Sequence, residues 1–105
     1  MSVPQTRLDE QIEEASRNLQ DAAGGDALCA ITRSGRSAPA VKYYEGRWAA
    51  LSEVRRAADA PGSSGVAVRD RWTGDLALLT ERGADANWIA YANGGVDALT
   101  EYVSD

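Results

Sequence analysis

Apolar residues recur at three- and four-residue spacing across residues 4–23, at Leu8, Ile12, Ala15 and Leu19. This spacing places them on one side of a helix, and most of the acidic residues of the segment fall on the other side. Thr6, followed three residues later by Asp9, fits a capping box, and Gly24-Gly25 is typical of a helix end. The pattern therefore predicts an amphipathic helix over residues 4–23.

Two short apolar segments follow this helix. Residues 27–33 are bounded by glycines and a turn-like stretch, which favours a central strand over a helix. Residues 39–45 alternate between two faces, one with Val41 and Tyr43 and the other with Lys42 and Tyr44. The short connection between the two segments predicts an antiparallel hairpin.

A second helix is expected over residues 47–59, where apolar residues again follow helical spacing at Trp48, Leu51, Val54 and Ala58. Residues 59–65 are rich in glycine, serine and proline. Such a stretch breaks regular structure, and its shortness indicates a surface loop within one domain rather than a linker between two.

The next part of the chain has the pattern of a second hairpin. Residues 66–72 and 75–81 alternate between apolar and other positions, and Thr73-Gly74 fits the two-residue turn that would join them. We therefore expect two further antiparallel strands.

The C-terminal part is less uniform. Residues 86–92 favour another strand, although a short helix capped by Asp85 and ended by Gly94 is an open alternative. Residues 95–103 carry apolar residues at helical spacing and predict a final helix.

The expected order of elements is α-β-β-α-β-β-β-α within a single domain over residues 1–105. An antiparallel sheet of about five strands with three packed helices is an α+β fold. The same order is similar to that of roadblock-type and profilin-like small domains. That resemblance implies an interaction or scaffold module and rests on element order alone.

Composition excludes several kinds of chemistry. The chain has no histidine, which removes the usual general acid–base group and the commonest metal ligand. Its single cysteine, Cys29, cannot form an internal disulfide or a thiolate-rich metal site, and we expect it in the core. No phosphate-binding loop or dinucleotide fingerprint is present, so no cofactor, metal or catalytic residue is predicted. The chain has no apolar run long enough to span a bilayer and no signal-peptide pattern, so a cytoplasmic location is expected.

Charge changes sign along the chain. Residues 1–32 carry a net charge of −4, residues 33–71 a net of +4 and residues 72–105 a net of −5. Strand alternation would place several of the central cations and one tyrosine on one sheet face. The predicted binding patch is therefore Lys42, Tyr44, Arg69 and Arg71, extended by Arg33, Arg36 and Arg47. Arginine and aromatic groups suit carboxylate, phosphate and base recognition, but the same cations have surplus acids with which to pair.

Three functions follow from these observations. The first is a non-enzymatic interaction or regulatory module whose partner is another protein or a second copy of the chain. The second is nucleic-acid binding by the basic central segment, which the net charge of −5 disfavours. The third is a small enzyme using carboxylate, tyrosine or arginine chemistry. Trp48, Trp72, Tyr43 and Trp88 are expected in the core.

Overall fold

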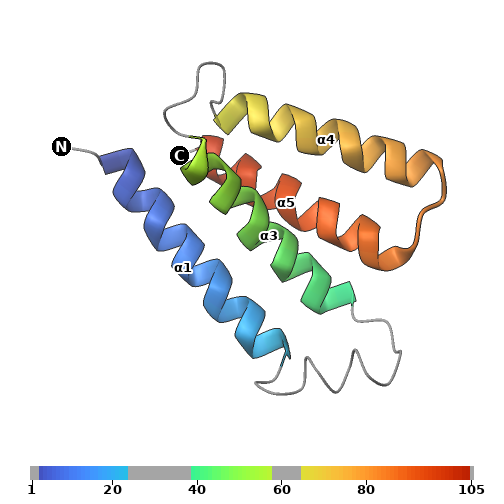
Figure 1. Ribbon diagram of the computed structural model, residues 1–105, viewed down its shortest axis with the longest axis horizontal. Coiled ribbons are helices and arrows are strands. Elements are labelled where there is room, and N and C mark those ends of the chain that lie inside the picture. The colour runs from blue at the N-terminus through green and yellow to red at the C-terminus, as the bar shows by residue number, and fades with distance from the viewer. Residues whose placement is uncertain (1–2, 24–38, 58–64, 105) are drawn as a thin grey trace.

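The computed structural model describes residues 3–23, 39–57 and 65–104, and these residues form helices, with a turn between the last two. The helices are α1 (Val3–Ala23), α3 (Pro39–Arg56), α4 (Gly65–Glu81) and α5 (Ala86–Ser104) (Figure 1). No strand occurs in this described part of the chain. The predicted α+β fold is therefore wrong. The likeness to roadblock-type and profilin-like domains depended on the predicted strands, so it is wrong as well.

The helices pack in the spatial order α1, α3, α5, α4. Helix α3 packs most extensively on α5, α1 covers the other side of α3, and α4 packs mainly on α5 (Figure 1). Helices α4 and α5 run antiparallel as a hairpin. Helices α3 and α5 therefore form the centre of the arrangement, with α1 packed on α3 and α4 packed on α5.

The core is built by the apolar stripes of all four helices. On α1 the predicted stripe is confirmed, because Leu8, Ile12 and Ala15 are all buried. They pack with buried residues of the other helices: Ala50, Leu51, Val54, Val68, Ala98 and Leu99. Trp72 and Tyr102 are half-buried against this cluster.

Glycines allow α3 and α5 to approach backbone to backbone. A Cβ atom on Gly46 would overlap the carbonyl oxygen of Tyr91, and one on Gly94 would overlap the carbonyl oxygen of Tyr43. Gly95 faces the other way, and a Cβ there would overlap the ring of Trp72 on α4. Gly94, which the sequence left open as the end of a short helix, lies with Gly95 inside α5, and both are packing positions.

The α4–α5 connection uses standard helix-end chemistry. Gly83 has a φ of 67°, and the amides of Gly83 and Ala84 donate to the carbonyls of Thr80 and Leu79 at 3.1 and 2.9 Å. This arrangement is a Schellman motif, in which the left-handed residue favours glycine. Asp85 then caps α5, because its Oδ1 accepts the amide of Asn87 at 2.8 Å. The alternative of a helix capped by Asp85 is thus confirmed, but it continues through Gly94 to Ser104.

The strands predicted at residues 39–45, 66–72, 75–81 and 86–92 are all helical. Short windows explain the error, because Val68 and Trp72 fit strand alternation and are also four residues apart on one helix face. Thr73-Gly74 is not a turn but the middle of α4, where the hydroxyl of Thr73 donates to the carbonyl of Arg69 at 2.8 Å.

Element boundaries also differ from the predictions. Helix α3 begins at Pro39 rather than at residue 47, since proline is well tolerated in the first turn of a helix. Helix α1 already includes Val3, so Thr6 lies within it and does not cap it. The predicted strand at 27–33, with Cys29, lies outside the described residues.

Candidate binding groove between α4 and α5

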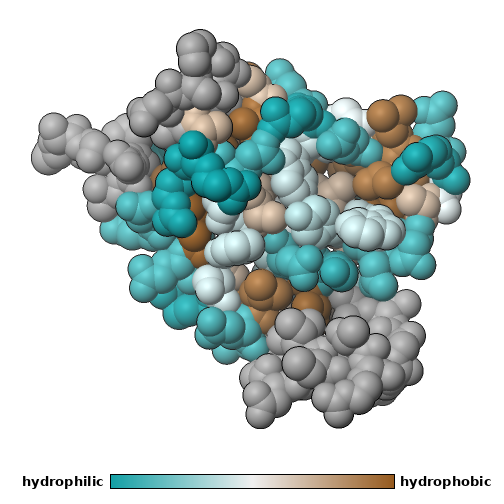
Figure 2. All heavy atoms as spheres, viewed as in Figure 1, coloured by the Kyte–Doolittle hydropathy of each residue, from teal (hydrophilic) through white to brown (hydrophobic). Residues whose placement is uncertain are grey.

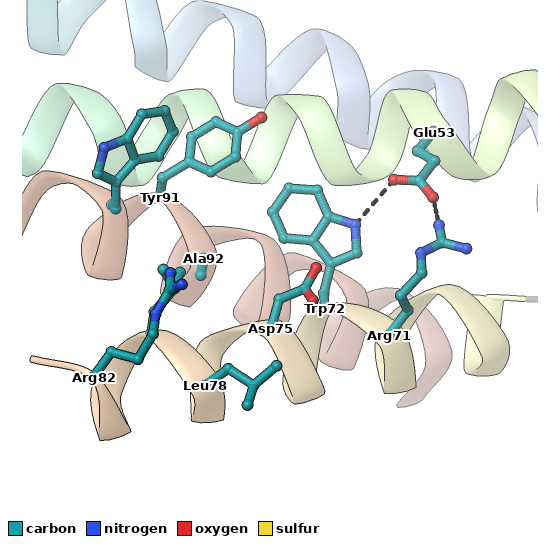
Figure 3. Close-up of a pocket in the computed structure, with 10 residues that line it drawn as sticks. Glu53, Arg71, Trp72, Asp75, Leu78, Arg82, Tyr91 and Ala92 are labelled. Atoms are coloured by element: carbon teal, nitrogen blue, oxygen red, sulfur yellow. Dashed lines mark hydrogen bonds and ion pairs between the residues drawn. The ribbon is translucent and has the colours of Figure 1, made fainter. Parts of the chain in front are cut away.

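A groove of about 480 Å³ runs between α4 and α5, with one residue of α3 at its edge. We call it the α4–α5 groove. Its lining is Glu53 of α3, then Arg71, Trp72, Asp75, Leu78 and Leu79 of α4, Arg82 directly after α4, and Trp88, Tyr91 and Ala92 of α5 (Figure 3). Its size and its mixture of aromatic, aliphatic and a few charged groups are typical of sites that bind ligands or partner side chains.

The groove has a fixed aromatic floor. The indole Nε1 of Trp72 donates to Oε1 of Glu53 at 3.0 Å, and Arg71 forms an ion pair with the same carboxylate (Figure 3). The rings of Trp72 and Tyr91 lie 5.5 Å apart, tilted by 32°. With Gly95 directly behind the indole, Trp72 is held on several sides and does not depend on a ligand for its position.

Exposed apolar side chains flank this floor. Leu78 on α4 is 59% exposed and Trp88 on α5 is 56% exposed, more than any other large apolar side chain in the described residues. The Trp88 ring meets Tyr91 edge to face at 6.0 Å, and Nζ of Lys42 lies 5.9 Å from its centroid. Figure 2 shows hydrophobic side chains at the surface over the C-terminal part of α4, surrounded by hydrophilic ones.

The lining charges of the groove balance. Glu53 and Asp75 are acidic, and Arg71 and Arg82 are basic. Glu53 and Arg71 pair with each other, whereas no ion-pair partner for Asp75 or Arg82 occurs among the residues described. Burial, with a further contribution from the negative charge of Glu45, raises the pKa of Tyr91. Its phenol therefore stays neutral at physiological pH.

The structure does not bring the predicted binding patch together. Arg71 lines the groove and Lys42 lies beside its Trp88 wall, while Arg69 lies on α4 next to Asp70. Tyr44 packs edge to face on Tyr43 of the same helix, with ring centroids 5.3 Å apart. Arg47 lies elsewhere, between α3 and α5, and Arg33 and Arg36 fall outside the described residues. Within the described residues no sheet face unites them.

Each described cation of that patch has an acidic neighbour. The nitrogen–oxygen distances are 3.3 Å for Lys42–Glu45, 2.8 Å for Arg47–Glu101 and 3.6 Å for Arg69–Asp70, and Arg71 pairs with Glu53. At these positions the cations therefore pair with acidic residues, the alternative that the sequence left open.

Arg47 takes part in a polar cluster that ties α3 to α5. The hydroxyl of Tyr43 donates to Oδ2 of Asp97 at 2.6 Å, and Arg47 donates to the Tyr43 oxygen at 3.3 Å and to Glu101. Burial, together with the hydrogen bond to Asp97, raises the pKa of Tyr43. Burial disfavours the charge of Arg47, but its hydrogen bonds outweigh this and raise its pKa. The cluster lies beside the glycine contacts and serves to hold the two helices together.

The described residues contain no group of three or more histidine, cysteine, aspartate or glutamate side chains placed to hold a metal ion. None of the helices in this part of the chain combines the length and the apolar character that a bilayer crossing requires. Comparisons with models of protein families, with curated proteins and with solved structures found no match to this chain.

The most exposed members of the groove were missed by the sequence analysis. Trp88 was expected in the core and is more than half exposed, and Trp48 is also 39% exposed. A signal for the α5 wall was present, because Trp88, Tyr91, Ala92 and Gly95 follow helical spacing directly after the Asp85 cap. The competing strand interpretation of residues 86–92 concealed it.

Proposed function

We propose that this protein is a non-enzymatic interaction module that contacts a protein partner through the α4–α5 groove. The observation that carries the proposal is the pair Leu78 and Trp88, the most exposed large apolar side chains described, on either side of a rigid aromatic floor. Exposed apolar groups that gather in one place, rather than singly, are characteristic of interaction sites.

The type of lining supports a protein partner. Tryptophan, tyrosine and arginine are enriched in protein interfaces and in the residues that dominate their binding energy. The groove contains Trp72, Trp88 and Tyr91 together with Arg71 and Arg82. Because Trp72 is already held by Glu53, binding need not order it, which lowers the entropic cost of association.

The charges make nucleic-acid binding the weaker candidate. The four described cations of the predicted patch are each beside a carboxylate, so little positive charge is left to attract phosphate. The groove itself has two acids against two arginines.

Catalysis is also less well supported. General acid–base catalysis works best when the pKa of the group lies near the working pH. In the groove the shift of Tyr91 is upward, away from neutrality, and no histidine exists to act beside it.

To test the proposal, a photo-crosslinking amino acid is introduced at position 78 in the cells that express the protein. The affinity for the partner identified in this way is then measured with the purified proteins. We expect a discrete protein adduct, which is absent when the crosslinker replaces exposed Val66 outside the groove lining. Trp88→Ala should then weaken binding about 30-fold, the loss typical of a central tryptophan. Trp48→Ala is the matched control and should leave the affinity unchanged.

Two results would overturn the proposal. One is the absence of any protein adduct at position 78. The other is a purified complex in which Trp88→Ala and Trp48→Ala have the same effect. Adducts to nucleic acid in place of protein would support the alternative function.

A further inference from the structure

A self-complementary pattern lies along the groove side of α4. It consists of Asp75, Leu78 and Leu79 of α4 and of Arg82, the residue that follows the helix, and we call it the α4 stripe. These residues follow the i, i+3, i+4, i+7 spacing that places side chains along one line of a helix. The two charged ends are opposite in sign and about 10.5 Å apart, from the rise of about 1.5 Å per residue.

A two-fold axis through the centre of this stripe would satisfy both charges. If α4 lies antiparallel on α4 of a second copy, Asp75 of each chain meets Arg82 of the other. The leucines then face each other across the axis. A two-fold interface uses the same patch on both subunits, so the patch must complement itself, and this one does.

We propose that the occupant of the α4–α5 groove is a second copy of this chain, paired with the first through antiparallel α4 stripes. The proposal deepens the proposed function and rests on it. Charge complementarity favours this occupant, because Asp75 and Arg82 have no ion-pair partner among the described residues and lie beside exposed Leu78. Figure 3 shows Asp75 of α4 and Arg82, next to the end of α4, projecting toward the groove.

The geometry also gives the apolar groups a partner. Exposed Leu78 of one copy would lie on Leu79 of the other, along the α4 side of the groove. Two α4–α5 hairpins joined in this way form a four-helix arrangement, a common solution for hairpins with an exposed apolar side.

Charge reversal gives a sharp test by sedimentation equilibrium. Asp75→Arg makes both ends of the stripe positive, and Arg82→Glu makes both ends negative. Each variant alone would place like charges together twice per dimer, so its dimer dissociation constant should rise at least about tenfold. The double variant Asp75→Arg/Arg82→Glu restores both pairs with reversed sign and should return close to the wild-type constant.

A mixture of the two single variants gives the most direct test of the antiparallel pairing. The Asp75→Arg chain and the Arg82→Glu chain complement each other, so the mixture should form a heterodimer although neither variant dimerises well alone. Glu81→Arg is the matched control, because it reverses a charge on another face of α4, outside the groove lining, and should leave dimerisation unchanged. Far-ultraviolet circular dichroism on every variant separates loss of folding from loss of dimerisation.

The outcomes separate this proposal from the proposed function. A wild-type monomer at every attainable concentration, with a position 78 adduct to a different protein, would overturn self-pairing and leave the interaction module standing. A monomer without any adduct would overturn both. A dimer that is insensitive to both single charge reversals would also overturn pairing through the α4 stripes, because that dimer would have to form through another surface.

Discussion

The close contact between α3 and α5 makes opposite predictions for two glycines that both lie inside helices. At Gly94, alanine would place its Cβ on the carbonyl oxygen of Tyr43 and 3.2 Å from the amide nitrogen of Arg47. At Gly74, in the middle of α4, alanine would meet nothing within 4 Å. The same substitution should therefore destabilise the protein at one position and stabilise it at the other.

The magnitudes follow from two effects. Alanine is preferred over glycine inside a helix by about 1 kcal/mol, and this gain applies at both positions. At Gly94 it is opposed by overpacking, which typically costs roughly 1–3 kcal/mol. We expect the upper end, because the obstructing atom belongs to the backbone and can move only with its helix. The net change in the free energy of unfolding is thus a loss of about 2 kcal/mol for Gly94→Ala and a gain of about 1 kcal/mol for Gly74→Ala.

Urea denaturation, with helix content followed by circular dichroism, measures both changes. For a domain near this size, each kcal/mol shifts the melting temperature by roughly 4–8 °C, so thermal melts should separate the two variants clearly. A Gly94→Ala protein as stable as the wild type would refute the backbone contact. A Gly74→Ala protein less stable than the wild type would refute the placement of this glycine at an exposed position within a continuous helix.

Three further predictions concern single side chains. The pKa values of Tyr43 and Tyr91 are raised, which means that folding favours the neutral phenols. Their contribution to the free energy of unfolding is therefore complete below the ordinary tyrosine pKa of about 10 and is lost as the pH rises through the pKa values of the folded state. The free energy of unfolding should fall above a pH of about 10, and it should fall less steeply in Tyr43→Phe. An unchanged slope in this variant would contradict the raised pKa of Tyr43. Glu53→Ala removes the acceptor of the Trp72 indole and should lower stability to urea by about 1–3 kcal/mol, whereas Glu53→Gln, which keeps an acceptor, should lower it less. Asp85→Ala should cost about 1 kcal/mol in the same assay through loss of the α5 cap, and no change would argue against that cap.

The sequence alone was sufficient for helices with a long apolar period. Residues 4–23 contain several turns of one stripe, and Leu8, Ile12 and Ala15 are buried as expected. The same holds for the last helix, where residues 95–103 were predicted helical and Leu99 is fully buried. In both cases the pattern extends far enough to separate a period of about 3.6 residues from one of 2.

The middle of the chain could not be assigned in this way. Helix α4 has only one buried residue, Val68, so its pattern carries little of the periodicity that reveals a helix. β-Branched and aromatic residues in short runs then favoured strands. Their helical state depends on packing against α5, a tertiary contact that no local window contains.

Glycine had the most misleading local signal. Gly94-Gly95 resembles a helix end, yet one glycine faces α3 and the other faces α4.

The residues of the candidate site could be predicted from the sequence only in part. Arg71 was named from the sequence and lines the groove, but Trp88, which was expected in the core, is a more than half exposed part of its lining.

Hydroxyl-radical footprinting tests whether the α4–α5 groove is a contact surface without any substitution, by comparing the oxidation of exposed side chains in the assembled protein with that in the dilute purified chain. If the groove is a contact surface, Leu78 and Trp88 are protected in the assembled state and the oxidation of Trp48 is unchanged. Equal oxidation of Leu78 and Trp88 in both states would contradict it.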